Sequence, residues 1–197
     1  MTLSRRTKAV IAFVIVIAAG YGLVLFWQSQ NQVPVAFANA RSQGAIIAQN
    51  IVNLSNQSDS TLAQVNTDDK DGDYKDALTL VSGLITQSAQ LRTQAVQLSN
   101  QIQQMTQSLS GINSVPAQQA ALEAISSYLA LINELITYSN DLDNLLAALQ
   151  AHFSGTATNN QQIPTLVNQI NTDVNAINNF NTQATQAMAQ FDKITGQ

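Results

Sequence analysis

The sequence predicts an all-α protein, with a single N-terminal transmembrane helix followed by an extracytoplasmic up-down-up-down bundle of four long antiparallel helices. Three observations predict this fold class. An uncharged run of 19 residues extends from Ala9 to Trp27. After it, apolar residues recur at spacings of three and four, the pattern of a helix that buries one face. Only 10% of the 197 residues are charged, while 76 are Asn, Gln, Ser or Thr, so we expect the outer helix faces to be polar but neutral.

The uncharged run has the length of a membrane span. As a helix it is about 28 Å long, close to the roughly 30 Å hydrocarbon core of a bilayer. The basic residues Arg5, Arg6 and Lys8 precede the run, and all 12 acidic residues follow it. Basic residues mark the cytoplasmic side of a span, and Trp is typical of its interface. We therefore predict a signal-anchor that extends from Ala9 to Trp27 in a bacterial envelope. Its N-terminus is expected in the cytoplasm.

A cleaved signal peptide is the alternative interpretation of this region. Ala36-Phe37-Ala38 fits a small-x-small cleavage site, with Pro34 just upstream. The apolar run, however, exceeds the 7–15 residues usual for a signal peptide, and the site lies about ten residues beyond it. The uncleaved anchor is the favoured prediction, and cleavage of residues 1–38 stays open.

The segments after the run are predicted from their apolar spacing. In chain order we expect a cytoplasmic segment 1–8, the span 9–27, a polar tether 28–34 and a bundle over 35–197, with helices over about 35–65, 74–112, 116–152 and 163–194. The first helix is the weakest, because Gly44 and residues 55–60 dilute its apolar set. That set is Phe37, Ile47, Ile51, Leu54, Leu62 and Val65.

The other three helices carry nearly continuous stripes. The second has a near-heptad stripe, as in coiled coils: Leu78, Val81, Ile85, Ser88, Leu91, Ala95, Leu98, Ile102, Met105, Leu109 and Ile112. The third is expected to begin with Ser114 as a cap and Pro116 in its first turn. Its inward set is Leu122, Ile125, Leu129, Ile132, Leu135, Tyr138, Leu142, Leu145, Leu149 and His152. The fourth stripe runs from Ile163 to Ile194, and Gly196 follows as a stop.

This layout of an anchor followed by an extracytoplasmic four-helix bundle resembles the sensor half of bacterial chemoreceptors. The resemblance is one of architecture and rests on no shared motif. Such receptors return through the membrane to a cytoplasmic signalling part, whereas this sequence stops at Gln197. A sensor role is therefore expected to need a separate membrane partner.

An acidic segment is the one candidate metal site. Residues 68–76 hold five Asp, and Asp69, Asp71 and Asp73 alternate around Gly72 in a pattern that suggests calcium. The EF-hand register fails, because Leu78 stands where the loop needs its bidentate carboxylate. The favoured interpretation is a solvated turn in which Asp73 caps the next helix. A weak calcium site is the alternative.

The remaining polar candidates favour structural roles. His152 is the only histidine and the chain has no Cys, so a zinc or copper site would need carboxylates to complete it. Tyr128 and Tyr138 are expected at the core edge, although with Arg92 they are candidates for lining a ligand pocket. The acidic residues of the third helix, expected on a solvated face, are Glu123, Glu134, Asp141 and Asp143.

No nucleotide-binding, hydrolase or metalloprotease motif occurs, and the acidic outer part argues against nucleic acid. We therefore predict no enzyme activity, no cofactor and no nucleic-acid partner. The predicted function is a structural or protein-interaction role for a single-pass membrane protein, with an unidentified protein partner or self-association. The alternative is a ligand-binding, sensor-like module that acts through a separate membrane partner.

Overall fold

The computed structural model of the chain describes residues 33–156 and 162–197. Of these residues, 92% are helical and none forms a strand, which confirms the all-α class for the described part of the chain. The predicted span and its flanks lie outside the described residues. They include the basic residues predicted to orient the span and the two residues predicted to bound it, which are Arg5, Arg6, Lys8, Ala9 and Trp27.

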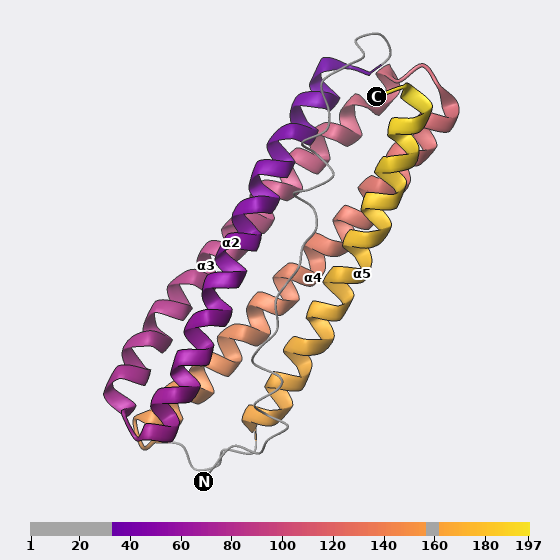
Figure 1. The fold of residues 1–197 in the computed structure, drawn as a ribbon. Helices are drawn as coiled ribbons and strands as arrows, with labels where there is room; N and C mark the ends of the chain where they lie inside the picture. Colours follow the sequence, from indigo (N-terminus) through magenta and orange to yellow (C-terminus); the bar gives the residue numbers. More distant parts are fainter. Residues whose placement is uncertain (1–32, 157–161) are drawn as a thin grey trace. The chain divides into compact units, whose positions relative to one another are not determined.

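Four long helices follow one another in the described chain (Figure 1). They are α2 (Val35–Asp71), α3 (Tyr74–Ser108), α4 (Val115–Phe153) and α5 (Gln162–Thr195), and the 3₁₀ turn η2 (Leu109–Gly111) follows α3. The connections from α2 to α3 and from α3 to α4 are short, so each of these pairs runs antiparallel.

The chain divides into two compact units, and each helix contributes a segment to both. In the described chain, unit 1 contains residues 53–93 and 135–175 without 157–161, and unit 2 contains 33–52, 94–134 and 176–197. Each unit therefore holds segments of all four helices around a core of its own.

The end of α2 lies in unit 1 and is set by a glycine. Gly72 has φ +80°, a left-handed conformation that glycine adopts without strain. The backbone N–H of Asp73 donates to the carbonyl oxygen of Asp68 at 2.8 Å, which satisfies a carbonyl at the helix end. α2 thus extends to Asp71, six residues beyond the predicted end at 65.

The start of α4 in unit 2 has the predicted cap. The hydroxyl of Ser114 accepts the backbone N–H of Ala117 at 3.4 Å, and Pro116 lies in the first turn, where no N–H is required. Nearby, Gln118 closes the connection, because its Nε2 donates to the carbonyl oxygens of Leu109 and Ile112 at 3.3 and 2.7 Å.

The inward face of α4 in unit 2 differs from the prediction. Leu122 and Leu129 were expected in the core, but they are 54% and 42% exposed. Buried alanines take their place together with Ile125, namely Ala117, Ala120, Ala121 and Ala124. Alanine lets neighbouring helices approach closely, whereas a hydrophobicity pattern favours the larger leucines on the adjacent face.

Among the described residues, α4 is the helix whose length and apolar content would allow it to cross a membrane. Its two apolar faces explain this composition, because α4 also supplies fully buried side chains such as Leu142 and Leu146. The core helix of a helical bundle outside a membrane can be equally long and apolar. Length and composition alone therefore do not place α4 in a bilayer.

The stripe of α3 keeps a strict alternation of three and four residues. Its buried members are Ala77, Val81, Leu84, Ser88, Leu91, Ala95, Leu98, Ile102 and Met105. Ile85, which the sequence placed on this face, is 39% exposed, and Leu84 is buried in its place. The two residues are adjacent and both apolar, so hydrophobicity alone could not choose between them.

Candidate functional site

A layer of buried polar side chains crosses the core of unit 1. Its fully buried members come from all four helices, and they are Ser55, Ser58, Ser88, Ser139 and Asp173. Ser55 and Ser58 fill the stretch of α2 where the apolar set is diluted, and they keep its spacing of three and four residues between Ile51 and Val65. The face that α2 buries is therefore continuous, although its middle is polar.

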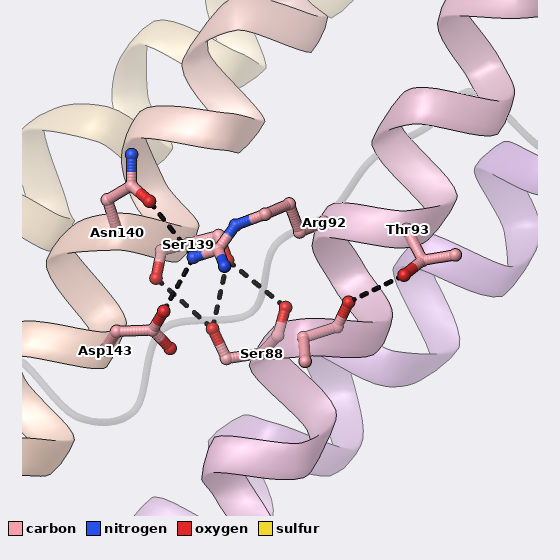
Figure 2. A network of polar contacts seen from close by, with 7 residues as sticks. Ser88, Arg92, Thr93, Ser139, Asn140 and Asp143 are labelled. Atoms are coloured by element: carbon pink, nitrogen blue, oxygen red, sulfur yellow. Dashed lines mark hydrogen bonds and ion pairs between the residues drawn. The ribbon is translucent and has the colours of Figure 1, made fainter.

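Paired hydroxyls join neighbouring helices within this layer. The Oγ atoms of Ser88 on α3 and Ser139 on α4 lie 3.0 Å apart, and each also lies 3.2 Å from the other residue's carbonyl oxygen (Figure 2). Ser58 Oγ on α2 lies 2.9 Å from the carbonyl oxygen of Leu54 and 3.0 Å from Gln87 Oε1 on α3. Small side chains at these positions allow close approach, and their hydrogen bonds favour one axial register.

Tyr138 lies beside Ser139 and is 2% exposed. Burial raises the pKa of its phenol well above the ordinary value of 10.0, and the carboxylates of Asp59 on α2 and Asp173 on α5 raise it further. Asp173, itself 1% exposed, accepts a hydrogen bond from Gln169 Nε2 at 3.2 Å. The neutral phenol is thus buried in the interior of unit 1, where it is subject to the charges of one carboxylate on α2 and one on α5.

Tyr138→Phe is expected to weaken the loss of stability at alkaline pH. Above about pH 10 the unfolded chain gives up the phenol proton while the folded chain keeps it, because the pKa of Tyr138 is raised on folding. The unfolded state then binds fewer protons, so the free energy of unfolding falls as pH rises, by up to about 1.4 kcal/mol per pH unit per tyrosine. Tyr128 in unit 2, whose pKa burial also raises, adds a loss of the same sign.

Urea unfolding of the full chain in detergent, followed by circular dichroism from about pH 9 to about pH 11.5, measures this slope. Tyr74→Phe is the matched control, because Tyr74 is 46% exposed, and it should keep the alkaline loss of the wild-type protein. Equal slopes for Tyr138→Phe and the wild type would contradict a buried neutral phenol.

A cation lies at the edge of the layer between α3 and α4. Arg92 Nη2 donates to Asp143 Oδ2 at 2.6 Å and to Asn140 Oδ1 at 3.0 Å (Figure 2). The two charged side chains are 40% and 39% exposed, and a pair this open to solvent contributes less than about 1 kcal/mol. The Arg92 guanidinium thus has a structural partner within unit 1.

The turn end of unit 1 holds aromatic ring contacts and a side-chain contact between α2 and α4. His152 Nε2 lies 3.1 Å from Asp69 Oδ1. The ring of Tyr74, at the start of α3, meets His152 edge-on at 6.1 Å and stacks on Phe153 at 5.9 Å. His152 therefore joins α4 to α2.

The structure separates the three candidate calcium ligands. Asp69 faces His152, whereas Asp71, the last residue of α2, and Asp73 in the turn are both exposed. Asp69 and Asp71 are two positions apart on one helix, so their side chains point in directions about 160° apart. In the described ranges, no group of three or more His, Cys, Asp or Glu side chains is placed to hold a metal ion.

Unit 2 contains an ion pair that is much less exposed to solvent than the Arg92–Asp143 pair of unit 1. Arg41 on α2 and Asp192 on α5 form a bidentate pair, with Nη1–Oδ1 at 2.7 Å and Nη2–Oδ2 at 2.9 Å. Their side chains are only 10% and 16% exposed. Burial is the main cause of the raised pKa of Tyr128, which the charge of Arg41 lowers and that of Asp192 raises. The rings of Phe37 and Phe191 lie 5.3 Å apart in the same core.

The residues considered for a ligand pocket are not brought together within one unit. Tyr128 belongs to unit 2, while Tyr138 and Arg92 belong to unit 1. The charges near Tyr128 are those of Arg41 and Asp192 in unit 2, while Tyr138 is near Asp59 and Asp173 and Arg92 pairs with Asp143 in unit 1. Of the α4 acids, Asp143 pairs with Arg92, and Glu123 is exposed while Glu134 and Asp141 are partly exposed.

Ser88 was predicted on the buried stripe, whereas Ser55, Ser58, Ser139 and Asp173 were not. Their signal was the unbroken spacing of three and four residues, which includes them once polar residues are allowed on the stripe. Comparison with family models, with curated proteins and with solved structures finds no match to this chain.

Proposed function

We propose that this chain is a single-pass membrane protein whose helical part is extracytoplasmic and has a structural or protein-interaction role without catalysis. One observation carries the proposal: an uncharged run of 19 residues separates three basic residues from all 12 acidic ones. A span of this length crosses a bilayer once, and the basic cluster orients it with residues 1–8 in the cytoplasm.

The contacts of the described polar side chains support a structural or protein-interaction role. Arg41 and Arg92 each pair with a carboxylate of another helix, and His152 lies beside the carboxylate of Asp69, so each of these side chains joins neighbouring helices within its own unit. A general base, a nucleophile and an orienting group within hydrogen-bond reach are the signature of many catalytic sites. The groups described here are arranged instead to stabilise the packing of each unit.

Single-cysteine labelling tests the topology, because the native chain has no Cys. Gln57→Cys, at an exposed position of α2, is expected to react with a membrane-impermeant maleimide in intact spheroplasts. Ser4→Cys is expected to react only after the membrane is permeabilised. Carbonate washing should leave the full-length chain in the membrane pellet.

A charge variant supplies the control for this experiment. Replacing Arg5, Arg6 and Lys8 with Glu removes the cationic signal for orientation but keeps the apolar run, so residue 4 should become accessible in part of the population. Release of a soluble form that lacks residues 1–38 would show that the chain is cleaved and not anchored.

A further inference from the structure

One end of unit 2 gathers the start of α2, the connection between α3 and α4, and the end of α5 (Figure 1). Pro34 packs directly on the connection, because a Cβ added to Gly111 would lie 2.7 Å from Pro34 Cγ. Three large apolar side chains are exposed here: Val35 is 74%, Val115 72% and Ile194 42% exposed. We call these three residues the end face.

Unit 2 carries most of the exposed large apolar side chains of the described chain and is nearly neutral. Seven of the nine large apolar residues that are exposed in the described chain belong to it, and Tyr74 and Ile85 are the other two. Its charged residues in the described ranges are Arg41, Lys193, Glu123, Glu134 and Asp192, whereas unit 1 holds nine Asp against Lys70, Lys75 and Arg92.

The charges closest to the end face suit an anionic surface. Asp192 is neutralised by Arg41, and Lys193 is exposed next to Ile194. The first acidic residue of α4, Glu123, follows Val115 by eight positions, about 12 Å along the helix. An anionic lipid headgroup layer would therefore meet three apolar side chains and Lys193 at this end, where the Asp192 carboxylate is paired with Arg41.

The tether limits how far the end face can lie from a bilayer. Within the tether predicted over 28–34, five residues, 28–32, separate Trp27 from Val33, the first described residue, and even fully extended this connection spans only about 20 Å. Given the anchor proposed above, the end of unit 2 that carries Pro34 stays near the headgroups at all times.

We propose that the end face of unit 2 docks on the lipid headgroup layer of the bilayer that holds the anchor, with Val35, Val115 and Ile194 entering the interface and Lys193 facing lipid phosphate. This inference rests on the proposed membrane anchor. A bilayer is a better occupant than a second copy of the chain, because three partly exposed side chains offer only a fraction of the roughly 800 Å² that each partner of a stable protein interface buries.

The test uses the full chain in vesicles of phosphatidylcholine and phosphatidylglycerol, with and without nitroxide-labelled phosphatidylcholine. A single cysteine at the end face, Val115→Cys, carries an environment-sensitive NBD fluorophore. We expect its emission to shift to shorter wavelength and to lose intensity in the nitroxide vesicles. Val96→Cys, 51% exposed in unit 2, and Tyr74→Cys in unit 1 are matched controls, and neither label should be quenched.

A second variant tests whether the apolar side chains cause the docking. Val35→Glu and Ile194→Glu, added to labelled Val115→Cys, should move the emission and the quenching to those of Val96→Cys. Flotation of the chain with vesicles should not change, since the apolar run alone holds it in the bilayer.

The possible outcomes separate this inference from the proposed function. A chain that does not float with vesicles refutes the anchor itself. If the chain floats but the label at 115 behaves like that at 96, the end face does not dock and the anchor stands. Docking is also refuted by quenching at all three labels, by a shift in wavelength without quenching, or by a signal that the two glutamates leave unchanged.

Discussion

Arg41→Met is expected to lower the free energy of unfolding by about 2–4 kcal/mol, because it leaves the carboxylate of Asp192 without its cation in a largely buried site. Both bonds of the bidentate pair are lost, and they measure 2.7 and 2.9 Å. With the two side chains only 10% and 16% exposed, water can replace the guanidinium only in part. Urea unfolding of the full chain in detergent, followed by far-UV circular dichroism, measures the loss.

The double variant Arg41→Met with Asp192→Leu should recover most of this stability. Removing both charges abolishes the desolvation cost along with the attraction, and a buried pair is often no more stabilising than apolar residues of similar volume. Arg92→Met is the matched control, because Arg92 and Asp143 are 40% and 39% exposed, and it should cost less than about 1 kcal/mol. Equal losses for Arg41→Met and Arg92→Met would contradict the buried character of the Arg41 pair.

Phe191→Ala is expected to cost about 3–5 kcal/mol, the range for removing a fully buried aromatic ring. Phe191 is 0% exposed, and its ring lies 5.3 Å from that of Phe37, which is also fully buried. The substitution removes this ring contact and leaves a cavity between α2 and α5. The same unfolding measurement applies, and the helical content at the start of the titration should be close to that of the wild type.

Ile194→Ala on the same helix is the control for this prediction. Ile194 is 42% exposed, so its truncation removes less buried surface and should cost less than about 1.5 kcal/mol. If the two variants lost the same stability, Phe191 would not be the core residue that its position indicates.

The positions of the helices could be predicted because helix formation depends on the local spacing of apolar residues. The start of α3 at Tyr74 and the cap of α4 at Ser114 follow from glycine, proline and hydroxyl residues next to an apolar periodicity. The end of α2 was less predictable, since Asp68 continues the buried face although it is an acidic residue, 8% exposed. Only the contact with its neighbours makes that position part of the core.

Much less of the candidate site could be predicted. Asp69 and His152 are 83 positions apart, and no local pattern indicates that their side chains lie 3.1 Å from each other. The same holds for Arg41 and Asp192, which are 151 positions apart. Partners of this kind depend on which helices are neighbours and on their axial register, and both are properties of the packed core.

The sequence by itself determined the helical class, the approximate helix limits and the separation of basic from acidic residues, because these depend on composition and on spacing along one chain. Tertiary structure decided which of two adjacent apolar faces is buried: α4 turns its alanines inward and exposes Leu122 and Leu129, and α2 buries Ser55 and Ser58. The physical reason is that close helix packing selects side chains by size and by hydrogen-bond partners, whereas a sequence pattern ranks them by hydrophobicity alone.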